Sequence, residues 1–250
     1  MSDPRDSSQA RLLAVLDLFN DQRLFWTPDD ISAALGVSRP TGYRYVRHLT
    51  EFGLLQRVHD GQVTLGPRII VLDHYIRHAD PVLQVGVPFM RELVALSGFD
   101  CVITRLMGDQ VLDTHREYSS APASLTYDRG RPRPLFLGAA PKLILAHLPT
   151  PQLRRLTQGR EDELARAGLP TEWAELRRYF GGIRKAGHYL STGELEAQLG
   201  ALAVPLLHRN GEVLGALALV TSVQRMAMMD TQRMTPLLQR AARDIAERLT

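Results

Sequence analysis

Apolar and polar positions follow two different periods along this chain, and the change of period separates expected helices from expected strands. Apolar residues recur at helical spacing from Ala10 to Asn20, after the polar residues 1–9, which we expect to be disordered. Thr27 and Pro28 predict the start of a short second helix, because Thr caps helix N-termini and Pro favours the first turn. That helix is expected to stop at Gly36.

A third helix is predicted over residues 38–52, and its two sides differ in chemistry. One side is formed by Gly42, Tyr45, Val46 and Leu49. The other side, with the residues that lead into it, supplies the candidates for DNA contact: Ser38, Arg39, Pro40, Thr41, Tyr43, Arg44 and Arg47. Arginine matches guanine edges and phosphate oxygens, so this side suits a DNA groove. An ordinary surface helix with solvated arginines is the alternative interpretation.

The pattern changes to that of strands after the third helix. Leu54–His59 and Gln62–Leu65 are expected to form two short strands joined at Asp60-Gly61, a dipeptide that favours a hairpin turn. Two helices separated by a short turn, with a hairpin directly behind them, are typical of a winged helix-turn-helix. We expect Arg57 and His59 in the wing to face the DNA backbone.

One more helix, residues 68–79, is predicted between the wing and a domain boundary at Asp80-Pro81. Its aliphatic stripe, formed by Ile69, Leu72 and Ile76, would be buried against another subunit. His74 and His78 have the i, i+4 spacing of metal ligands, but no third ligand is near in sequence, so solvated histidines are the simpler interpretation. The expected organisation is 1–66 for the DNA-binding domain, 67–80 for the linker helix and 81–250 for the second domain.

Helices and hairpins are interleaved in the second domain. A helix is expected over Val82–Ser97, and a C-terminal helix is expected to start at Asp230. Further helices are predicted at residues 139–147, 153–156 and 172–185, and strands at residues 100–107, 110–117, 125–127, 187–191, 202–207 and 213–220. Residues 129–134 are basic and Pro-rich and cannot form a central strand. Antiparallel hairpins between helices indicate an α+β fold.

Composition narrows the class of protein. A length of 250 residues favours two domains, and 44% apolar with 23% charged residues is typical of a soluble globular chain. The N-terminus shows no apolar stretch like that of a secretory signal, and no apolar run is long enough to span a bilayer, so no membrane partner is expected. The single cysteine, Cys101, fits a reducing cytoplasm. Net charge is only +3, but cations concentrate between Arg39 and Arg57, as in a DNA-reading module.

The chain resembles the IclR family of bacterial transcriptional regulators over nearly its whole length. The resemblance rests on SRPTGYRYVRHLTEFGLL in the third helix, DGQVTLGPRIIVL in the wing and linker, LFLGAAPKLILAHLP in the second domain, and AGHYLSTGELEAQLGALAVPLLHRNGEVLGALAL near its end. It implies a GAF-like α/β effector-binding domain, homodimers that often pair into tetramers, and an effector that changes DNA binding. Thr41 and Arg44 match the family pattern. Gly42 replaces the usual aliphatic residue, at a cost of about 1 kcal/mol relative to Ala in a helix.

The same resemblance implies an effector pocket in the second domain. In family members the block that begins at Leu135 lines this pocket, and backbone N–H groups of residues 138–140 at a helix start would favour a carboxylate. Ser191 and Thr192 match another pocket block, although capping or turn roles would also explain them. Alternation over Val213–Val220 gives that strand two distinct faces. The candidate effector-binding residues are Leu135, Ala139, Ala140, Ser191, Thr192, Ala201, Ala218 and Val220.

Two functions remain open at this point. Small apolar pocket walls predict an organic acid with a hydrophobic or aromatic body, as effector of a regulator that binds double-stranded DNA at a roughly palindromic operator. The rival is a small-molecule-processing enzyme fused to a DNA-binding module. Asp113 and His115 fall on one strand face by alternation, and Cys101 could approach them from a neighbouring strand. No nucleophile elbow, phosphate loop or metal cluster accompanies them, so we expect no catalysis, metal or cofactor.

Overall fold

The computed structural model describes residues 7–124 and 126–249. The chain divides into two compact units, Met1–Asp80 and Pro81–Thr250. The expected disorder of residues 1–6 and the strand position Leu125 lie outside the described residues.

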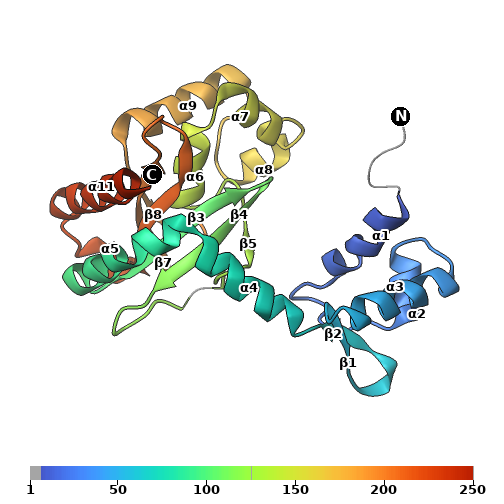
Figure 1. The fold of residues 1–250 in the computed structure, drawn as a ribbon. Coiled ribbons are helices and arrows are strands. Elements are labelled where there is room, and N and C mark those ends of the chain that lie inside the picture. Colours follow the sequence, from blue (N-terminus) through green and yellow to red (C-terminus); the bar gives the residue numbers. More distant parts are fainter. Residues whose placement is uncertain (1–6, 125, 250) are drawn as a thin grey trace. The chain divides into compact units, whose positions relative to one another are not determined.

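The first unit carries the helix-turn-helix and the hairpin in the predicted order (Figure 1). Its elements are α1 (Ser8–Ala14), η2 (Leu16–Leu18), α2 (Pro28–Ala34), α3 (Arg39–Glu51), β1 (Leu55–Arg57), η3 (His59–Gly61), β2 (Val63–Leu65) and α4 (Arg68–Ala79). Asp60 and Gly61 at the hairpin tip have φ angles of 58° and 72°, the left-handed values that this turn dipeptide favours. The predicted hairpin turn is therefore confirmed.

The N-terminal expectation was wrong in two respects. The Ser7 hydroxyl accepts a hydrogen bond from the Ala10 amide at 3.1 Å, so helix α1 starts at Ser8 and residues 7–9 are ordered. The single helix expected over residues 10–20 is broken into α1 and the 3-10 turn η2, which ends at Leu18. The apolar spacing alone did not show this break.

Helices α2 and α3 approach each other closely at Gly42. A Cβ at this position would overlap Ser32 Oγ and would lie 3.0 Å from Ser32 Cβ and 3.2 Å from its Cα. The side of α3 predicted to be buried is buried, and it packs into the core of this unit together with Val15, Ile31, Leu55 and Val63. The glycine that departs from the family pattern thus has a steric reason, which is the short distance between the two helices.

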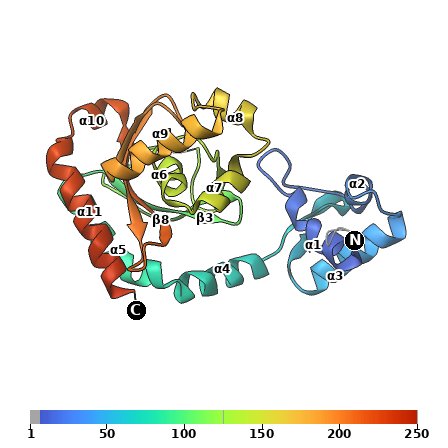
Figure 2. The same ribbon diagram turned by 90° about the horizontal axis from the view of Figure 1, so that it is seen from above.

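The second unit is a six-stranded antiparallel sheet between two layers of helices (Figures 1 and 2). In chain order its elements are α5 (Pro81–Ser97), β3 (Asp100–Met107), β4 (Gln110–Glu117), β5 (Pro132–Arg133), α6 (Ala139–His147), α7 (Thr150–Thr157), α8 (Glu161–Arg166), α9 (Trp173–Ala186), β6 (Tyr189–Thr192), β7 (Leu199–Leu207), β8 (Val213–Ser222), α10 (Val223–Ala227) and α11 (Thr231–Arg248). The strand order is β5-β4-β3-β8-β7-β6.

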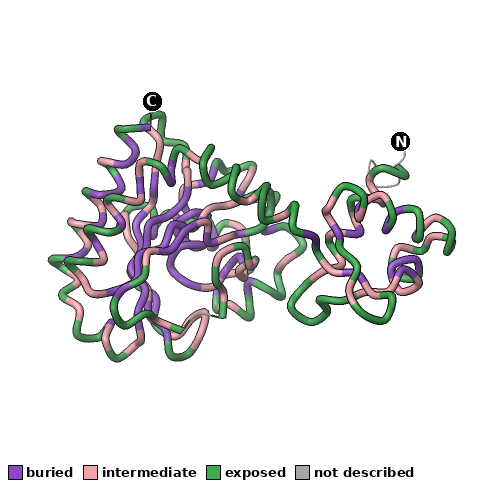
Figure 3. The backbone as a smooth tube through the Cα atoms, turned by 60° about the horizontal axis from the view of Figure 1, so that its bottom comes forward, coloured by how far each residue is buried: buried purple, intermediate pink, exposed green. Residues whose placement is uncertain are grey.

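Each face of this sheet has its own hydrophobic core. On one face, the strands pack against α5 and α11 through residues such as Ile103, Leu217 and Ile245. On the other face they pack against α6 and α9, with Ala218 and Leu143 among the contacts. The buried backbone in the sheet region, purple in Figure 3, marks these two cores. The predicted alternation of β8 is confirmed from Ala216 to Val220, since Ala216, Ala218 and Val220 enter one core and Leu217 and Leu219 enter the other.

Several element boundaries in the second unit differ from the expectations. Thr126 and Tyr127 form a bend, so the described part of the expected strand 125–127 is not a strand. Residues 132–133 pair with β4 as a two-residue strand at the edge of the sheet, which agrees with the exclusion of a central strand. Residue Gly187 ends α9 in a left-handed conformation, and β6 starts only at Tyr189. Helices α8 and α10 were missed, and α7 is longer than expected.

A β-bulge in the β3–β4 hairpin corrects the placement of two polar residues. The register pairs Ile103 with His115 but Thr104 with Asp113, so one extra β4 residue lies between them. Asp113 therefore shares the α6 face with Thr104, whereas His115 shares the α5 face with Ile103. Simple alternation, which placed Asp113 and His115 on one face, was wrong because of the bulge.

Candidate functional site

The outward side of α3 presents the predicted chemistry to solvent. Pro40, Tyr43, Arg44 and Arg47 are exposed, and 47% of the Tyr43 surface is accessible. An exposed ring of this size between arginines is suited to contact with nucleic acid rather than to core packing. Ser38 and Thr41, at the start of the helix, bond to each other through their hydroxyl oxygens at 2.9 Å.

The arginines of α3 differ in their local partners. Arg39 makes a two-pronged ion pair with Asp29 of α2, with Nε–Oδ1 and Nη2–Oδ2 distances of 2.7 and 2.6 Å. Arg47 lies 3.5 Å from the Glu51 carboxylate, one helical turn further on. Arg44 has neither an ion pair nor a hydrogen bond from its side chain within the described residues. Its guanidinium is therefore the most available of the three for a ligand.

The wing carries its predicted cations at the surface. Arg57 at the end of β1 and His59 at the tip are exposed. The hairpin is held against the rest of the unit by Trp26 and Val63, which exchange two backbone hydrogen bonds of 3.0 and 2.8 Å. This contact fixes the wing beside the helix-turn-helix.

A small cavity lies on the α6 face of the second unit. Its volume is about 20 Å³, which is enough for about one water molecule. It is lined by Tyr127, Arg133, Gly138, Ser191, Leu195, Leu199, Gly200, Ala201 and Val220. Most of these side chains are apolar, and Arg133 is the cation among them.

Three of the eight predicted effector residues line this cavity, namely Ser191, Ala201 and Val220. Strand β6 buries Ser191 and exposes Thr192, since successive strand residues point to opposite faces. The remaining predicted residues, Leu135, Ala139, Ala140 and Ala218, are at least 95% buried in the core between α6 and the sheet. The structure therefore moves the candidate pocket toward β6, β7 and the segment around Arg133.

Arg133 is a site residue that the sequence reasoning missed. Its side chain is 10% exposed, and its Nη1 donates to both Asp113 carboxylate oxygens at 2.8 and 3.0 Å. Thr104 Oγ1 donates to the same carboxylate at 2.7 Å. Arg133 Nε is buried and has no hydrogen-bond partner within the described residues. Among the described residues, this guanidinium is thus paired through Nη1 alone.

A carboxylate of the protein itself lies at the start of α6. Glu194 Oε2 accepts hydrogen bonds from the Gly138 amide at 3.1 Å and from Lys142 Nζ at 2.6 Å. Its other oxygen, Oε1, accepts one from the Tyr189 hydroxyl at 3.0 Å. Burial, with the neighbouring Tyr179 and Glu194, raises the pKa of Tyr189, so this hydroxyl stays a donor.

The segment that carries Glu194 closes one side of the cavity. Leu195, one of the cavity walls, lies between Glu194 and Glu196. The Glu196 carboxylate accepts hydrogen bonds from the backbone amide and the hydroxyl of Thr126, both at 2.9 Å. Tyr127, another wall, follows Thr126 directly. Residues 193–198, which we call the closing segment, are therefore tied both to α6 and to the segment that contains Tyr127.

A buried ion pair anchors the chain that leads from β4 toward the cavity. Asp100 is fully buried and lies 2.6 Å from Arg116 Nη2. It also accepts from the amides of Ser119 and Ala123 at 2.7 and 2.8 Å. Burial alone would raise the pKa of Asp100, but these donors outweigh it and lower the pKa below the usual value of 3.8.

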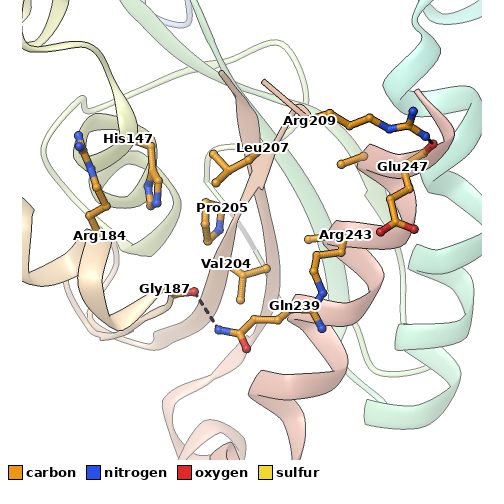
Figure 4. A pocket seen from close by; sticks show the side chains of 12 residues that line it. His147, Arg184, Gly187, Val204, Pro205, Leu207, Arg209, Gln239, Arg243 and Glu247 are labelled. Carbon is orange, nitrogen blue, oxygen red and sulfur yellow. Dashed lines mark hydrogen bonds between the residues drawn. The ribbon is translucent and has the colours of Figure 1, made fainter. Parts of the chain in front are cut away.

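Two larger grooves lie elsewhere on the second unit. One, of about 460 Å³, runs along the β7 edge between α9 and α11, where Gln239 donates to the Gly187 carbonyl at 3.2 Å (Figure 4). Its charged walls, Arg184, Arg209, Arg243 and Glu247, are exposed. The other, of about 550 Å³, lies beside the turn between β7 and β8. Because water screens charges on such open walls, these grooves select ligands less well than a closed cavity does.

The three residues considered for catalysis are not brought together. Asp113 lies on the α6 face, whereas Cys101 and His115 lie on the α5 face. His115 Nε2 is 2.8 Å from the Glu117 carboxylate. Burial, with the nearby Glu117, raises the pKa of the Cys101 thiol, so the group stays protonated and is a poor nucleophile. A buried structural role explains these residues.

Neither a metal cluster nor a membrane helix is found in the described part of the chain. The ring centroids of His74 and His78 are 4.0 Å apart, with the rings tilted by 39°, and His78 Nδ1 lies 2.8 Å from the His74 carbonyl oxygen. No group of three or more potential ligand residues occurs among residues 7–124 and 126–249. None of the helices described there combines the length and the apolarity needed to cross a bilayer.

Comparison with known proteins shows which class these features define. The description "IclR helix-turn-helix domain" matches residues 8–59, and "Bacterial transcriptional regulator IclR C-terminal" matches residues 74–247. The fold and the site thus define a transcriptional regulator with an N-terminal DNA-binding helix-turn-helix. The chain belongs to the IclR family of bacterial transcriptional regulators.

Relatives and solved structures agree with this assignment. XynR, an HTH-type transcriptional regulator of Escherichia coli strain K12, is 25% identical over 89% of this chain and 88% of its own length. The Pca regulon regulatory protein of Pseudomonas putida is 27% identical, over 97% and 84% of the two chains. An IclR homolog from Microbacterium hydrocarbonoxydans, crystallised with 4-hydroxybenzoate, has a TM-score of 0.76 at 26% identity, covering 96% of this chain and 98% of that one.

Proposed function

We propose that this regulator binds a roughly palindromic DNA operator through α3 and the wing. The observation that carries the proposal is the exposed basic side of α3, where the Arg44 guanidinium has no partner within the described residues. The proposed contact residues are Ser38, Arg39, Pro40, Thr41, Tyr43, Arg44, Arg47, Arg57 and His59. Arg39 also braces α3 against α2 through Asp29, so we assign it to positioning and phosphate contact, and Arg44 to base reading. A DNA-binding regulator of this kind works in the cytoplasm.

The proposed regulator acts as a homodimer, or as a tetramer made of two dimers. Helix α4 has no buried residue in the described chain, and Leu72 and Ile76 are 39% and 61% exposed. Apolar side chains aligned along one helix lose unfavourable contact with water when a second copy covers them. A two-fold dimer places two copies of α3 on DNA, and it therefore requires two half-sites separated by about one helical turn or a multiple of it.

The proposed effector is an organic acid with an apolar or aromatic body. The walls formed by Leu195, Leu199, Ala201 and Val220 favour an apolar body. The solved relative that carries 4-hydroxybenzoate supports an aromatic acid. A cavity of about 20 Å³ is smaller than any such molecule, so binding has to open the pocket. This opening is the change that we propose is transmitted to the DNA-binding unit.

Two measurements test this function. Footprinting on DNA fragments selected by the full-length protein should show protection of two related half-sites. An asymmetric single site would count against the dimeric arrangement. A thermal-shift screen of aromatic acids, short oxo-acids and neutral aromatics should then show stabilisation by aromatic acids, and the ligand should be recovered unchanged. Stabilisation by short oxo-acids alone would contradict the apolar pocket, and turnover of the ligand would favour an enzyme.

A further inference from the structure

The cavity contains a buried arginine that is only half paired. Arg133 is one of the cavity walls, and its Nη1 is held by Asp113. The side-on edge of the same guanidinium consists of Nε and Nη2, and Nε is buried without an acceptor in the described residues. Leaving such a donor buried and unpaired costs free energy, so the site is stabilised by any ligand that supplies an acceptor. Two parallel N–H donors on one planar edge match the two oxygens of a carboxylate.

The position of this edge is fixed by its neighbours. Asp113 receives donors from both Arg133 and Thr104, so its carboxylate holds the guanidinium in one orientation. Gly138 has a φ of 88°, and Arg133 Nη2 lies 3.6 Å from the point where a Cβ on Gly138 would be. The Nη2 end of this edge is thus held next to the start of α6, and Arg133 lines a cavity whose other walls are mostly apolar. A prearranged donor pair of this kind loses little entropy when a ligand binds.

The start of α6 is already occupied. The Gly138 amide and Lys142 both donate to Glu194, and the Tyr189 hydroxyl satisfies its other oxygen. A second carboxylate at the same place would compete for these donors and would be repelled by Glu194. The helix start therefore acts as a fastening point for the closing segment, and a ligand carboxylate needs a different partner.

We propose that Arg133 is the residue that selects a carboxylate effector, which it binds through its Nε–Nη2 edge. This inference rests on the proposed effector function of the same cavity. The apolar body of the acid contacts Leu195, Ala201 and Val220, and Ser191 lines the same space. Glu194 keeps the closing segment on α6 and does not contribute to the choice between an acid and a neutral ligand.

The test compares an acid with its neutral analogue. Binding of 4-hydroxybenzoate and 4-hydroxybenzamide to the full-length protein is measured by calorimetry at pH 7, where only the acid is charged. The readout is the ratio of the two affinities, because a change that merely loosens the cavity weakens both ligands alike. The wild-type protein should prefer the acid.

Two variants remove the Nε–Nη2 edge of Arg133 in different ways. Arg133→Lys keeps a cation beside Asp113 but has no planar edge, and it should reduce acid affinity roughly tenfold or more with little change for the amide. The double variant Asp113→Asn/Arg133→Gln removes both charges of the ion pair and leaves no unpaired buried charge. It therefore stays folded even if Arg133→Lys unfolds the protein. It should abolish the preference for the acid over the amide. Thermal unfolding and circular dichroism confirm folding of each protein.

Two further variants complete the design. Arg225→Lys is the matched control, because Arg225 donates to the carbonyls of Ala121 and Gly98 rather than to a group of the cavity. Its acid preference should equal that of the wild type. Glu194→Gln should change both affinities alike. A preference that rises in Glu194→Gln would assign the ligand carboxylate to the start of α6 and overturn the proposal.

The possible failures are distinguishable. If the wild type prefers the acid and both Arg133 variants keep that preference, the assignment of Arg133 is wrong and the proposed effector class stands. If the wild type binds the amide as well as the acid, Arg133 does not select a carboxylate. If the wild type binds neither ligand nor any acid of the screen, the proposed effector class itself fails, and the role of Arg133 fails with it.

Discussion

The close approach of α2 and α3 makes Gly42→Ala an informative substitution. In an open helix this change stabilises a protein by about 1 kcal/mol. Here the new Cβ overlaps Ser32 Oγ and lies 3.2 Å from Ser32 Cα, which belongs to the backbone. Turning Ser32 away relieves only the first contact. It also breaks the 2.7 Å hydrogen bond from Ser32 Oγ to the Pro28 carbonyl.

The magnitudes decide the sign of this effect. Loss of the buried hydrogen bond costs about 0.5–1.5 kcal/mol, and overpacking costs about 1–3 kcal/mol. After subtraction of about 1 kcal/mol of helix propensity, Gly42→Ala should destabilise the first unit by about 0.5–3.5 kcal/mol. The shift of α3 should also weaken operator binding, because the arginines on its outer side move with it.

Urea unfolding followed by tryptophan fluorescence measures this effect in the full-length protein. Trp26 lies in the first unit and Trp173 in the second, so a Trp173→Phe background reports the first unit alone. In α9, a Cβ on Gly181 would meet no described atom within 4 Å, so Gly181→Ala is the matched control. It should stabilise the second unit by about 1 kcal/mol, measured with Trp173 retained.

A double-mutant cycle with Ser32→Ala then isolates the contact. Removal of the hydroxyl should make Gly42→Ala less harmful, with a coupling of about 0.5–3 kcal/mol between the two positions. If Gly42→Ala is as stable as the wild type and shows no coupling to Ser32, the steric argument is refuted.

Three other predictions concern DNA binding, assembly and acid stability. Arg44→Ala should cost about 1–3 kcal/mol of binding free energy on operator DNA and relax sequence specificity. Arg57→Ala should weaken binding to all DNA sequences alike and lower the slope of log affinity against log salt concentration by about one. Equal losses of affinity for Arg44→Ala on operator and random DNA would contradict base reading. Leu72→Glu should reduce the mass measured by light scattering while the second unit stays folded, and an unchanged mass would mean that the stripe packs within one subunit. Asp100→Asn leaves the buried Arg116 without its carboxylate partner, so it should cost about 3–5 kcal/mol. Because the pKa of Asp100 is lowered, its ionised carboxylate stabilises the folded protein above pH 3.8, and this stabilisation is lost as the pH falls below that value. The free energy of unfolding, measured as a function of pH, should lose this dependence in Asp100→Asn.

Much of the fold could be predicted from the sequence because its signals are local. Strands β3 and β4 and helix α6 have the predicted boundaries, since a glycine turn or a change of period marks each end. Helices α8 and α10 contain only six and five residues, too few for a helical period to stand out. The bulge in β4 depends on how β3 pairs with it, and the residues of β4 alone do not encode that register.

The candidate site was harder to predict, because its chemistry depends on contacts between distant residues. Arg133 lies in a basic, Pro-rich connection that gives no sign of burial. It becomes buried because it pairs with Asp113 across the edge of the sheet. The signal that could have found it is Asp113 itself, since a carboxylate that a strand carries into the interior of a sheet needs a cation nearby. Likewise, nothing in the spacing of Glu194 indicated that its carboxylate would occupy the start of α6.

The buried Cys101 has a practical consequence. It is the single cysteine of the chain, and its thiol is inaccessible and kept protonated by its surroundings. Maleimide dyes react with exposed thiolates, so they should leave the native protein unlabelled. Cysteines introduced at exposed positions, such as Gln9 in the first unit and Glu92 in the second, can then carry a donor and an acceptor dye without removal of Cys101. Energy transfer between the two dyes would report directly how an effector alters the separation of the two units.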